Sequence, residues 1–260
     1  HILPTVLIAI AAIVALFPIV FTVASSFMSG TEIADRYTAE ITETNAGDFN
    51  SSGIHFVRFG LIPEQPTLDQ YKELLLNSPD YLRMFWNSVL LVVPVLIGQC
   101  ILAPLAAFGI ENIRWKYKEA IYFTYIIVML MPTQILLVPN FIVAGWLGIR
   151  ENYLAIILPA MFHPLGVFLV RQQLKNFPKE CLEAAQLDGA GAYQAFHYIV
   201  RPNLTSVVAA LAVLLFADNW NIVDQAVVFL KNTFDNPLSV YLGEVVSGDP
   251  GMFFAVSVFY

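Results

Sequence analysis

The sequence predicts an all-α membrane protein with about six transmembrane helices, the last of them truncated. Of its 260 residues, 58% are hydrophobic and only 13% are charged, whereas a water-soluble domain of this size carries about 25% charged residues. Several long runs lack Asp, Glu, Lys and Arg, and the longest can cross a hydrocarbon layer of about 30 Å as helices. We therefore expect residues 1–260 to form a single transmembrane domain in the cell membrane.

The first charge-free run predicts a span over residues 2–27, with a kink at Pro18. Residues 28–83 follow as the one long polar region, in which acidic residues outnumber basic ones. We expect this region to be an extracytoplasmic insert. Within it, apolar residues at helical spacing between residues 66 and 76 predict a short amphipathic helix.

The remaining apolar runs predict four further spans and the beginning of a sixth. Their limits are residues 85–110, 120–139, 153–170, 204–230 and 251–260. The last run has ten residues, about half of the length that a span needs. We therefore expect the sequence to be a fragment that lacks the end of the sixth span and a short N-terminal piece.

The basic residues predict which connections face the cytoplasm. Residues 111–118 and 171–202 together hold seven Lys and Arg residues in 40 positions, whereas the connections assigned to the opposite side hold six in 88. Lys and Arg are enriched in cytoplasmic loops. The segments 111–118 and 171–202 are therefore expected in the cytoplasm.

A helix-turn-helix is predicted between residues 177 and 202, within the cytoplasmic segment. Pro178 suits a first helical turn, Gly189 suits a left-handed helix exit, and Pro202 is expected to end the second helix. Apolar residues at helical spacing give each helix one apolar face that needs a partner. These residues are Leu182, Ala185 and Gly189 in the first helix and Tyr193, Phe196 and Val200 in the second.

DNA-binding motifs share this helix-glycine-helix pattern. A helix that reads DNA is basic, but the basic residues of this segment are balanced by acidic ones. We therefore expect no nucleic-acid partner.

The segment resembles the cytoplasmic signature of binding-protein-dependent ABC import permeases, E-A-A-x-x-x-G-x9-I-x-L-P. The matching residues are Glu183, Ala184, Ala185, Gly189, Ile199 and Pro202, and Asp188 and Ala190 give the Asp-Gly-Ala form of the carbohydrate, or maltose-type, class. The sequence departs from the signature at Arg201, where Leu is usual, and at Ser206, where a second Pro is common. The resemblance implies that these eight matching residues dock on a separate ATPase subunit.

The same resemblance implies a subunit of an ATP-driven importer that moves a sugar or oligosaccharide by alternating access. Its implied partners are a second permease, two ATPase subunits, an extracytoplasmic solute-binding protein, membrane lipid and the sugar. The sequence has no G-x-x-x-x-G-K-[ST] motif. ATP and Mg²⁺ are therefore expected on the ATPase subunits, with no cofactor, metal or catalytic residue on this chain.

A polar cluster in the fifth predicted span is the candidate substrate route. It comprises Asp218, Asn219, Trp220, Asn221 and Asp224. Carboxylates inside a span are costly, so they normally face a bundle interior or a wet cavity. Amides and carboxylates match sugar hydroxyls, and an aromatic face can stack on a pyranose ring. Alternatively, Trp220 belongs to an interfacial belt and the acids pair with a partner subunit or with water.

The cluster also resembles the Trp-Asn-Asp/Glu region of carbohydrate permeases, although the acid usually follows the Asn directly. Four other polar residues of the spans are weaker candidates, for which helix–helix hydrogen bonding is expected. They are Gln99, Gln134, Asn140 and His163.

Three other interpretations stay open at this point. The first is an ABC permease for a non-sugar solute. The second is half of an ion-coupled secondary transporter that works through Asp218 and Asp224, which would need an internal repeat that the sequence lacks. The third is a membrane scaffold that recruits a cytoplasmic partner, which would not need polar groups in the fifth span.

Overall fold

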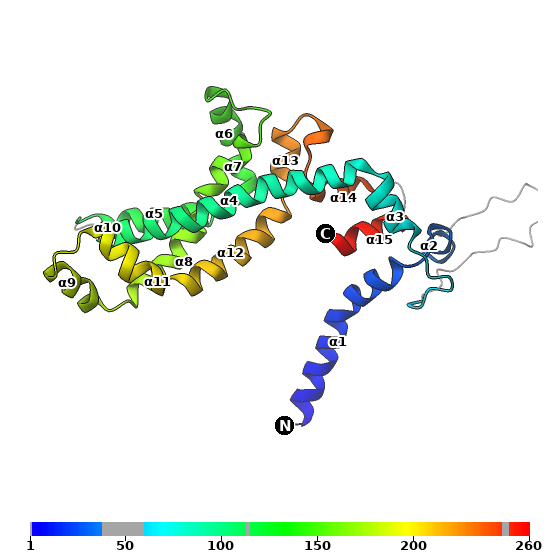
Figure 1. Cartoon of the computed structure of the whole chain (residues 1–260), viewed down its shortest axis with the longest axis horizontal. Coiled ribbons are helices and arrows are strands. Elements are labelled where there is room, and N and C mark those ends of the chain that lie inside the picture. The colour runs from blue at the N-terminus through cyan, green and yellow to red at the C-terminus, as the bar shows by residue number, and fades with distance from the viewer. Residues whose placement is uncertain (1, 38–59, 113–114, 246–249) are drawn as a thin grey trace, which may run out of the picture. The chain divides into compact units, whose positions relative to one another are not determined.

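The computed structural model describes residues 2–37, 60–112, 115–245 and 250–260. All regular secondary structure in these residues is helical (Figure 1), so the predicted all-α class is confirmed. Much of the predicted insert, residues 38–59, lies outside this part of the chain. The residues group into two compact units, one of 1–84 with 238–260 and one of 85–237, which we describe separately.

By length and hydropathy, three described segments can each cross a membrane. They are residues 4–25, 79–112 and 154–175. Two bent helix pairs raise the number to as many as five. These segments agree with a membrane protein, while the predicted total of six spans stays a prediction.

The first unit contains the N-terminal span. α1 (Ile2–Ser25) matches the first predicted span, and its residues 4–20 are all exposed, as expected for apolar side chains that face lipid. α15 (Pro250–Phe259) packs against α1, with the ring centroids of Phe21 and Phe254 5.7 Å apart. The C-terminal apolar run therefore forms a helix that contacts the first span.

Four shorter elements complete this unit. They are α2 (Gly30–Tyr37), α3 (Asp69–Lys72), the π-helical turn η1 (Glu73–Asn77) and α14 (Leu238–Val245). The predicted amphipathic helix at residues 66–76 is thus present as α3 and η1. Its Leu74 is fully buried.

In the second unit, α4 (Pro79–Asn112) is longer than the span predicted at 85–110 and continues through both of its prolines. The next predicted span, 120–139, is not one helix. α5 (Lys118–Met129) and α6 (Thr133–Trp146) meet at an angle of 102°, and α6 turns away from the line of α5 (Figure 1). Pro132 explains the break, because proline lacks an N–H and disfavours helical backbone at the preceding residue.

The fourth predicted span consists of α7 (Leu154–Met161) and α8 (Pro164–Lys175). Gln99 of α4 ties the junction together, since its Nε2 donates to the carbonyl oxygens of Ala160 and His163, each at 3.0 Å. Gly166 lies beside this side chain, and a Cβ there would come within 2.4 Å of Gln99 Oε1. Gln99 therefore has the helix–helix hydrogen-bonding role that was expected for it.

We call residues 177–202 the elbow. It contains α9 (Lys179–Leu187), α10 (Ala192–Ala195), the π-helical turn η2 (Phe196–Val200) and most of α11 (Arg201–Asn203). The prediction that the second helix ends before Pro202 is wrong, because helical backbone continues to Asn203 and bends by 71° before α12 (Thr205–Trp220). Pro202 lies in the first turn of α11, where a missing N–H costs little.

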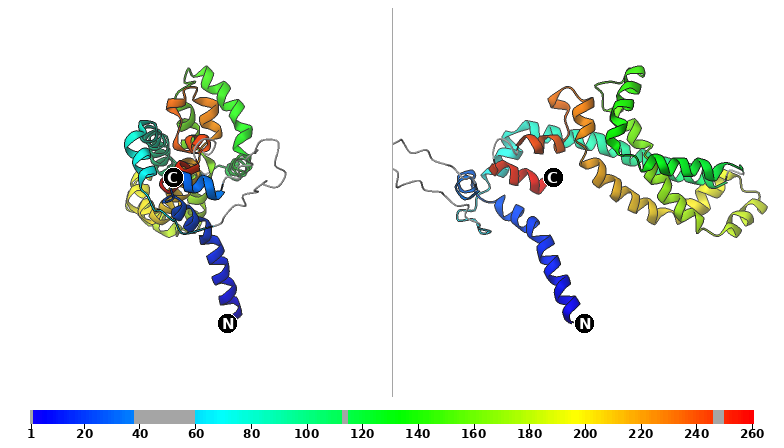
Figure 2. Two further views of the ribbon diagram at one scale, coloured as in Figure 1. Left: turned by 90° about the vertical axis from the view of Figure 1, so that its right-hand side faces the viewer. Right: turned by 180° about the vertical axis from the view of Figure 1, so that it is seen from behind.

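The fifth predicted span, 204–230, is also broken. α12 ends at Trp220, and three residues separate it from α13 (Asp224–Phe229), so one continuous helix is a wrong prediction. α12 packs along α8 (Figure 2). One buried core joins the elbow to these helices, and its members are Ala103 and Ala107 of α4, Val167, Val170 and Leu174 of α8, Phe196 and Val200 of η2, Leu204, and Leu211 and Leu215 of α12.

Candidate functional site

The corner of the elbow requires glycine for its backbone conformation. Gly189 has φ +84°, a left-handed value that glycine adopts without strain. The amide of Ala190 donates to the carbonyl of Ala185 at 2.9 Å and that of Asp188 to Ala184 at 3.0 Å, which closes the end of α9. A Cβ at Gly189 would meet no atom within 4 Å. The conformation, and not the lack of space, therefore selects glycine here.

The eight predicted docking residues divide into buried and exposed sets. Ala185 is buried, and Ala190 and Ile199 are half-buried. The other five are exposed, namely Glu183, Ala184, Asp188, Gly189 and Pro202. Ala185 is therefore closed to a partner, while the exposed residues form a surface that a partner can reach.

Two exposed apolar residues of the elbow were missed by the sequence analysis or placed wrongly. Leu187 is 89% exposed and lies one helical turn from Glu183 and Ala184, so it extends the exposed surface of α9. Tyr193 was expected on the inner face of the second helix but is 74% exposed. We call Glu183, Ala184, Leu187 and Asp188 the docking surface.

Arg171 was expected to begin the cytoplasmic loop, but it lies inside α8 with its side chain fully buried. Its Nε is 3.1 Å from Glu111 Oε2 at the end of α4, and its Nη2 is 2.6 Å from Glu119 Oε1 in α5. The guanidinium carbon lies 3.7 Å from the centroid of the Tyr122 ring. We call these four residues the arginine cluster. It connects α4, α5 and α8 near the beginning of the elbow.

Arginine suits this position because its planar fork can bond two carboxylates and stack on a ring at the same time. Glu111 also pairs with Lys118, at 3.6 Å. The sequence analysis missed the cluster because its members come from three different helices. The available signal in the sequence was that Glu111, Glu119 and Arg171 each lie directly beside a charge-free run.

A second group of polar residues gathers where two helices break. The start of α6 and the α12–α13 junction enclose a cavity of about 210 Å³, which we call the polar pocket. Its polar lining consists of Thr133, Gln134, Asp218, Asn219, Asn221, Asp224 and Gln225. Gln134 Nε2 donates to Asp224 Oδ2 at 3.1 Å and so links the two broken segments.

Four of the five predicted substrate-route residues line the polar pocket, and Trp220 does not. The Trp220 ring packs at 5.8 Å from that of Phe85 and at 5.2 Å from that of Phe216. Gln134, considered a weaker candidate, also belongs to the pocket, as does Gln225, which the sequence places beside Asp224, while Thr133 was missed. Pro132, directly before Thr133 and Gln134, was the available signal for the break that exposes them.

The polar pocket is smaller than most small-molecule sites, which occupy about 300–1,000 Å³. The amides of Asn219 and Asn221 donate to carbonyls of their own helix, at 2.8 and 2.6 Å. Asp218 and Asp224 are exposed and can accept hydrogen bonds from hydroxyl groups. In size and exposure, the pocket therefore resembles one polar side of a larger opening more than a closed binding site. Across the described residues, no His, Cys, Asp and Glu side chains gather as a metal site.

Comparisons with known proteins agree with these features. The family model for the "Binding-protein-dependent transport system inner membrane component" matches residues 99–260. The chain is 34% identical over 138 residues to the lactose transport system permease protein LacG of Rhizobium radiobacter, which covers 53% of this chain and 50% of that protein. The chain thus spans about half the length of this relative.

Two further relatives match over more of the chain. The arabinooligosaccharides transport system permease protein AraQ of Halalkalibacterium halodurans is 26% identical over 210 residues, or 81% of this chain and 68% of that protein. The sn-glycerol-3-phosphate transport system permease protein UgpE of Brucella abortus is 25% identical over 214 residues, or 80% and 68%.

The fold is shared with a solved structure, that of a bacterial ABC transporter involved in the import of the acidic polysaccharide alginate. The two have a TM-score of 0.76 at 20% identity, with 99% of this chain and 88% of that chain covered. Since the family model covers more than half of the residues, this chain belongs to the family of binding-protein-dependent transport system inner membrane components.

Proposed function

We propose that this chain is a permease subunit of an ATP-driven importer that moves a sugar or oligosaccharide into the cell. The main evidence for this proposal is the structure of the elbow. Its docking surface is exposed, while Phe196 and Val200 in its second half are buried in the core that also contains residues of α4, α8 and α12. A segment exposed on one side and fixed to the membrane helices on the other can pass the movement of a docked partner to those helices.

The proposed complex contains a second permease, two ATPase subunits and an extracytoplasmic solute-binding protein. ATP and Mg²⁺ belong to the ATPase subunits, because this chain carries no phosphate-binding loop motif. Closure of the ATPases would move the elbow, and with it α8 and α12, between two arrangements of the spans. Alternating access follows if the two arrangements open the route to opposite sides.

The polar pocket favours a neutral carbohydrate as the solute. Asp218 and Asp224 are exposed on its lining, and within the described residues neither forms an ion pair. Carboxylates accept hydrogen bonds from sugar hydroxyls but repel a phosphate group. A phosphorylated polyol is the second candidate, because the relatives include permeases named for sn-glycerol-3-phosphate.

Reconstitution tests the proposal and separates the two solutes. The chain would be purified with its co-expressed partner subunits, placed in proteoliposomes with ATP inside, and supplied with the binding protein. We expect ATP-dependent uptake of labelled neutral oligosaccharide and little uptake of labelled sn-glycerol 3-phosphate. The opposite preference would reject the carbohydrate assignment, and purification of the chain without an ATPase subunit would reject the importer itself.

A further inference from the structure

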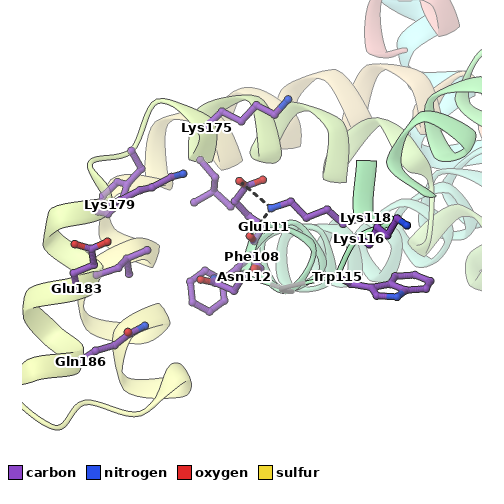
Figure 3. Close-up of a pocket in the computed structure, with 13 residues that line it drawn as sticks. Phe108, Glu111, Asn112, Trp115, Lys116, Lys118, Lys175, Lys179, Glu183 and Gln186 are labelled. Carbon is purple, nitrogen blue, oxygen red and sulfur yellow. Dashed lines mark hydrogen bonds and ion pairs between the residues drawn. The ribbon is translucent and has the colours of Figure 1, made fainter. Parts of the chain in front are cut away.

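A second cavity, of about 760 Å³, lies between the elbow and the ends of three helices. Figure 3 shows Trp115, Lys116 and Lys118 on one side of it and Lys175, Lys179 and Glu183 on the other. We call it the lysine cavity. It is separate from the polar pocket, and one of its lining residues, Glu183, also belongs to the docking surface.

The charges around the lysine cavity do not balance. The cationic groups of Arg171 and Lys118 neutralise the carboxylates of Glu111 and Glu119, with which they form ion pairs. The three other lysines of the lining, Lys116, Lys175 and Lys179, then face only Glu183. Within the described residues none of the three forms an ion pair with a carboxylate, so the cavity keeps an excess of two positive charges.

Four apolar side chains also line the cavity, and we call them the apolar wall. Phe108, Leu174, Phe177 and Leu182 form this wall, and Leu174 is buried. The wall begins where the charge-free runs of α4 and α8 end, at Glu111 and Arg171, which is the depth at which a bilayer changes from hydrocarbon to headgroups. Trp115 lies at this level and is 51% exposed, as is typical of aromatic residues at a membrane interface.

From this arrangement we propose that the lysine cavity binds the phosphate headgroup of an anionic phospholipid. Lys116, Lys175 and Lys179 supply the positive charge for the phosphate, and the apolar wall takes the first part of an acyl chain. A free inorganic anion would make no contact with the apolar wall. A nucleic acid would need a basic surface without Glu183 and without the apolar residues. Anionic lipids are present in the cytoplasmic leaflet. The inference therefore rests on the proposed cytoplasmic position of the elbow.

Native mass spectrometry of the intact transporter complex tests the lipid site. The complex would be equilibrated with equal amounts of phosphatidylglycerol and phosphatidylcholine of the same chain length, and the bound lipids counted. We expect bound phosphatidylglycerol to exceed phosphatidylcholine in the unmodified complex. In the double variant K116Q/K175Q, which leaves the elbow unchanged, this preference should fall about thirtyfold, since two lysines near an anionic surface contribute about 1 kcal/mol each.

The matched control is K72Q/K231Q, which removes two exposed lysines assigned to the opposite side of the membrane. This variant should keep the preference for phosphatidylglycerol. Equal binding of both lipids by the unmodified complex, an equal loss in the two double variants, or displacement of phosphatidylglycerol by inorganic phosphate alone would each overturn the proposal. Lipid binding is counted without solute or ATP, so the lipid proposal can be refuted while the transport proposal is supported. The transport proposal can likewise be refuted while the lipid proposal is supported.

Discussion

The arginine cluster and the polar pocket each contain two carboxylates, but the carboxylates have opposite surroundings. In each, the two carboxylates come from consecutive segments of the chain, Glu111 and Glu119 in the first and Asp218 and Asp224 in the second. In the arginine cluster, a fully buried guanidinium lies between Glu111 and Glu119. In the polar pocket, Asp218 and Asp224 are exposed, and Asp224 accepts a hydrogen bond from the Gln134 amide. A neutralised and buried charge holds helices together, whereas an exposed charge without a cation stays available to a solute.

Under the proposed function, the arginine cluster would pass on the movement of the elbow, and the polar pocket would line the solute route. The arginine cluster joins α4, α5 and α8 next to the elbow, so it can transmit a displacement without deforming. The polar pocket lies at two helix breaks, where the angle between segments can change. Four substitutions test this division, and the largest effect is expected in the arginine cluster.

R171M should destabilise the complex most. It removes the cation between two carboxylates and leaves them facing each other, which costs about 3 kcal/mol, the lower end of the range for a broken buried pair because Glu119 is partly exposed. The measurement is thermal unfolding of the purified complex, with loss of uptake in proteoliposomes. R171K keeps the charge and should recover part of the stability. If R171M unfolded at the temperature of the unmodified complex, the cluster would not hold the helices together.

G189V should uncouple ATP hydrolysis from transport while leaving membrane insertion intact. A branched residue at φ +84° is strained by about 1–2 kcal/mol, so the corner must open and the docking surface must rotate. G191A is the control, because Gly191 has φ −71° and its Cβ would meet only Gln194 Oε1 at 3.9 Å. The ratio of solute imported to ATP hydrolysed is the measurement. Normal solute-stimulated ATPase activity with normal uptake in G189V would contradict the role of the corner.

D224N should slow uptake by about threefold to tenfold, the effect of one weakened hydrogen bond to a solute hydroxyl. The asparagine keeps an oxygen that can accept from Gln134, so the fold of the pocket should not change. N221A should act in the same direction. Initial uptake rates and the unfolding temperature would be compared for each variant. Full-rate transport by both variants would remove the polar pocket from the route.

W220F should have the smallest effect. Trp220 packs between Phe85 and Phe216, and a phenylalanine keeps most of that aromatic contact at a cost of about 1 kcal/mol in unfolding free energy. Uptake should stay unchanged, because the ring does not line the polar pocket. A large fall in uptake at unchanged stability would instead support sugar stacking on Trp220.

Several features of the elbow could be predicted from neighbouring residues alone. Pro178, Gly189 and the apolar spacing of Leu182 and Ala185 predict a helix, a left-handed corner and an inner face, and the structure has all three. Tyr193 follows the same spacing but is exposed. Periodicity gives the face of a helix that can be buried, but it does not say how far the partner surface extends.

The helix breaks were harder to predict. Pro132 marks one of them, but residues 221–223 contain neither proline nor glycine, and the break there is stabilised by contacts such as the one between Asp224 and Gln134. The partners of Arg171 lie 60 and 52 residues earlier in the chain. No pattern along the sequence relates such positions.

The sequence by itself determined the all-helical class, the lipid-facing runs and the glycine corner, because backbone conformation and hydropathy depend on residues close together in the chain. Only the tertiary structure decided which carboxylates meet a cation and which stay exposed. That choice depends on how helices far apart in sequence pack, and a shift of a single helical turn would exchange one set of neighbours for another. The arginine cluster, and the contact between Gln134 and Asp224 that completes the polar pocket, therefore became visible only in the folded chain.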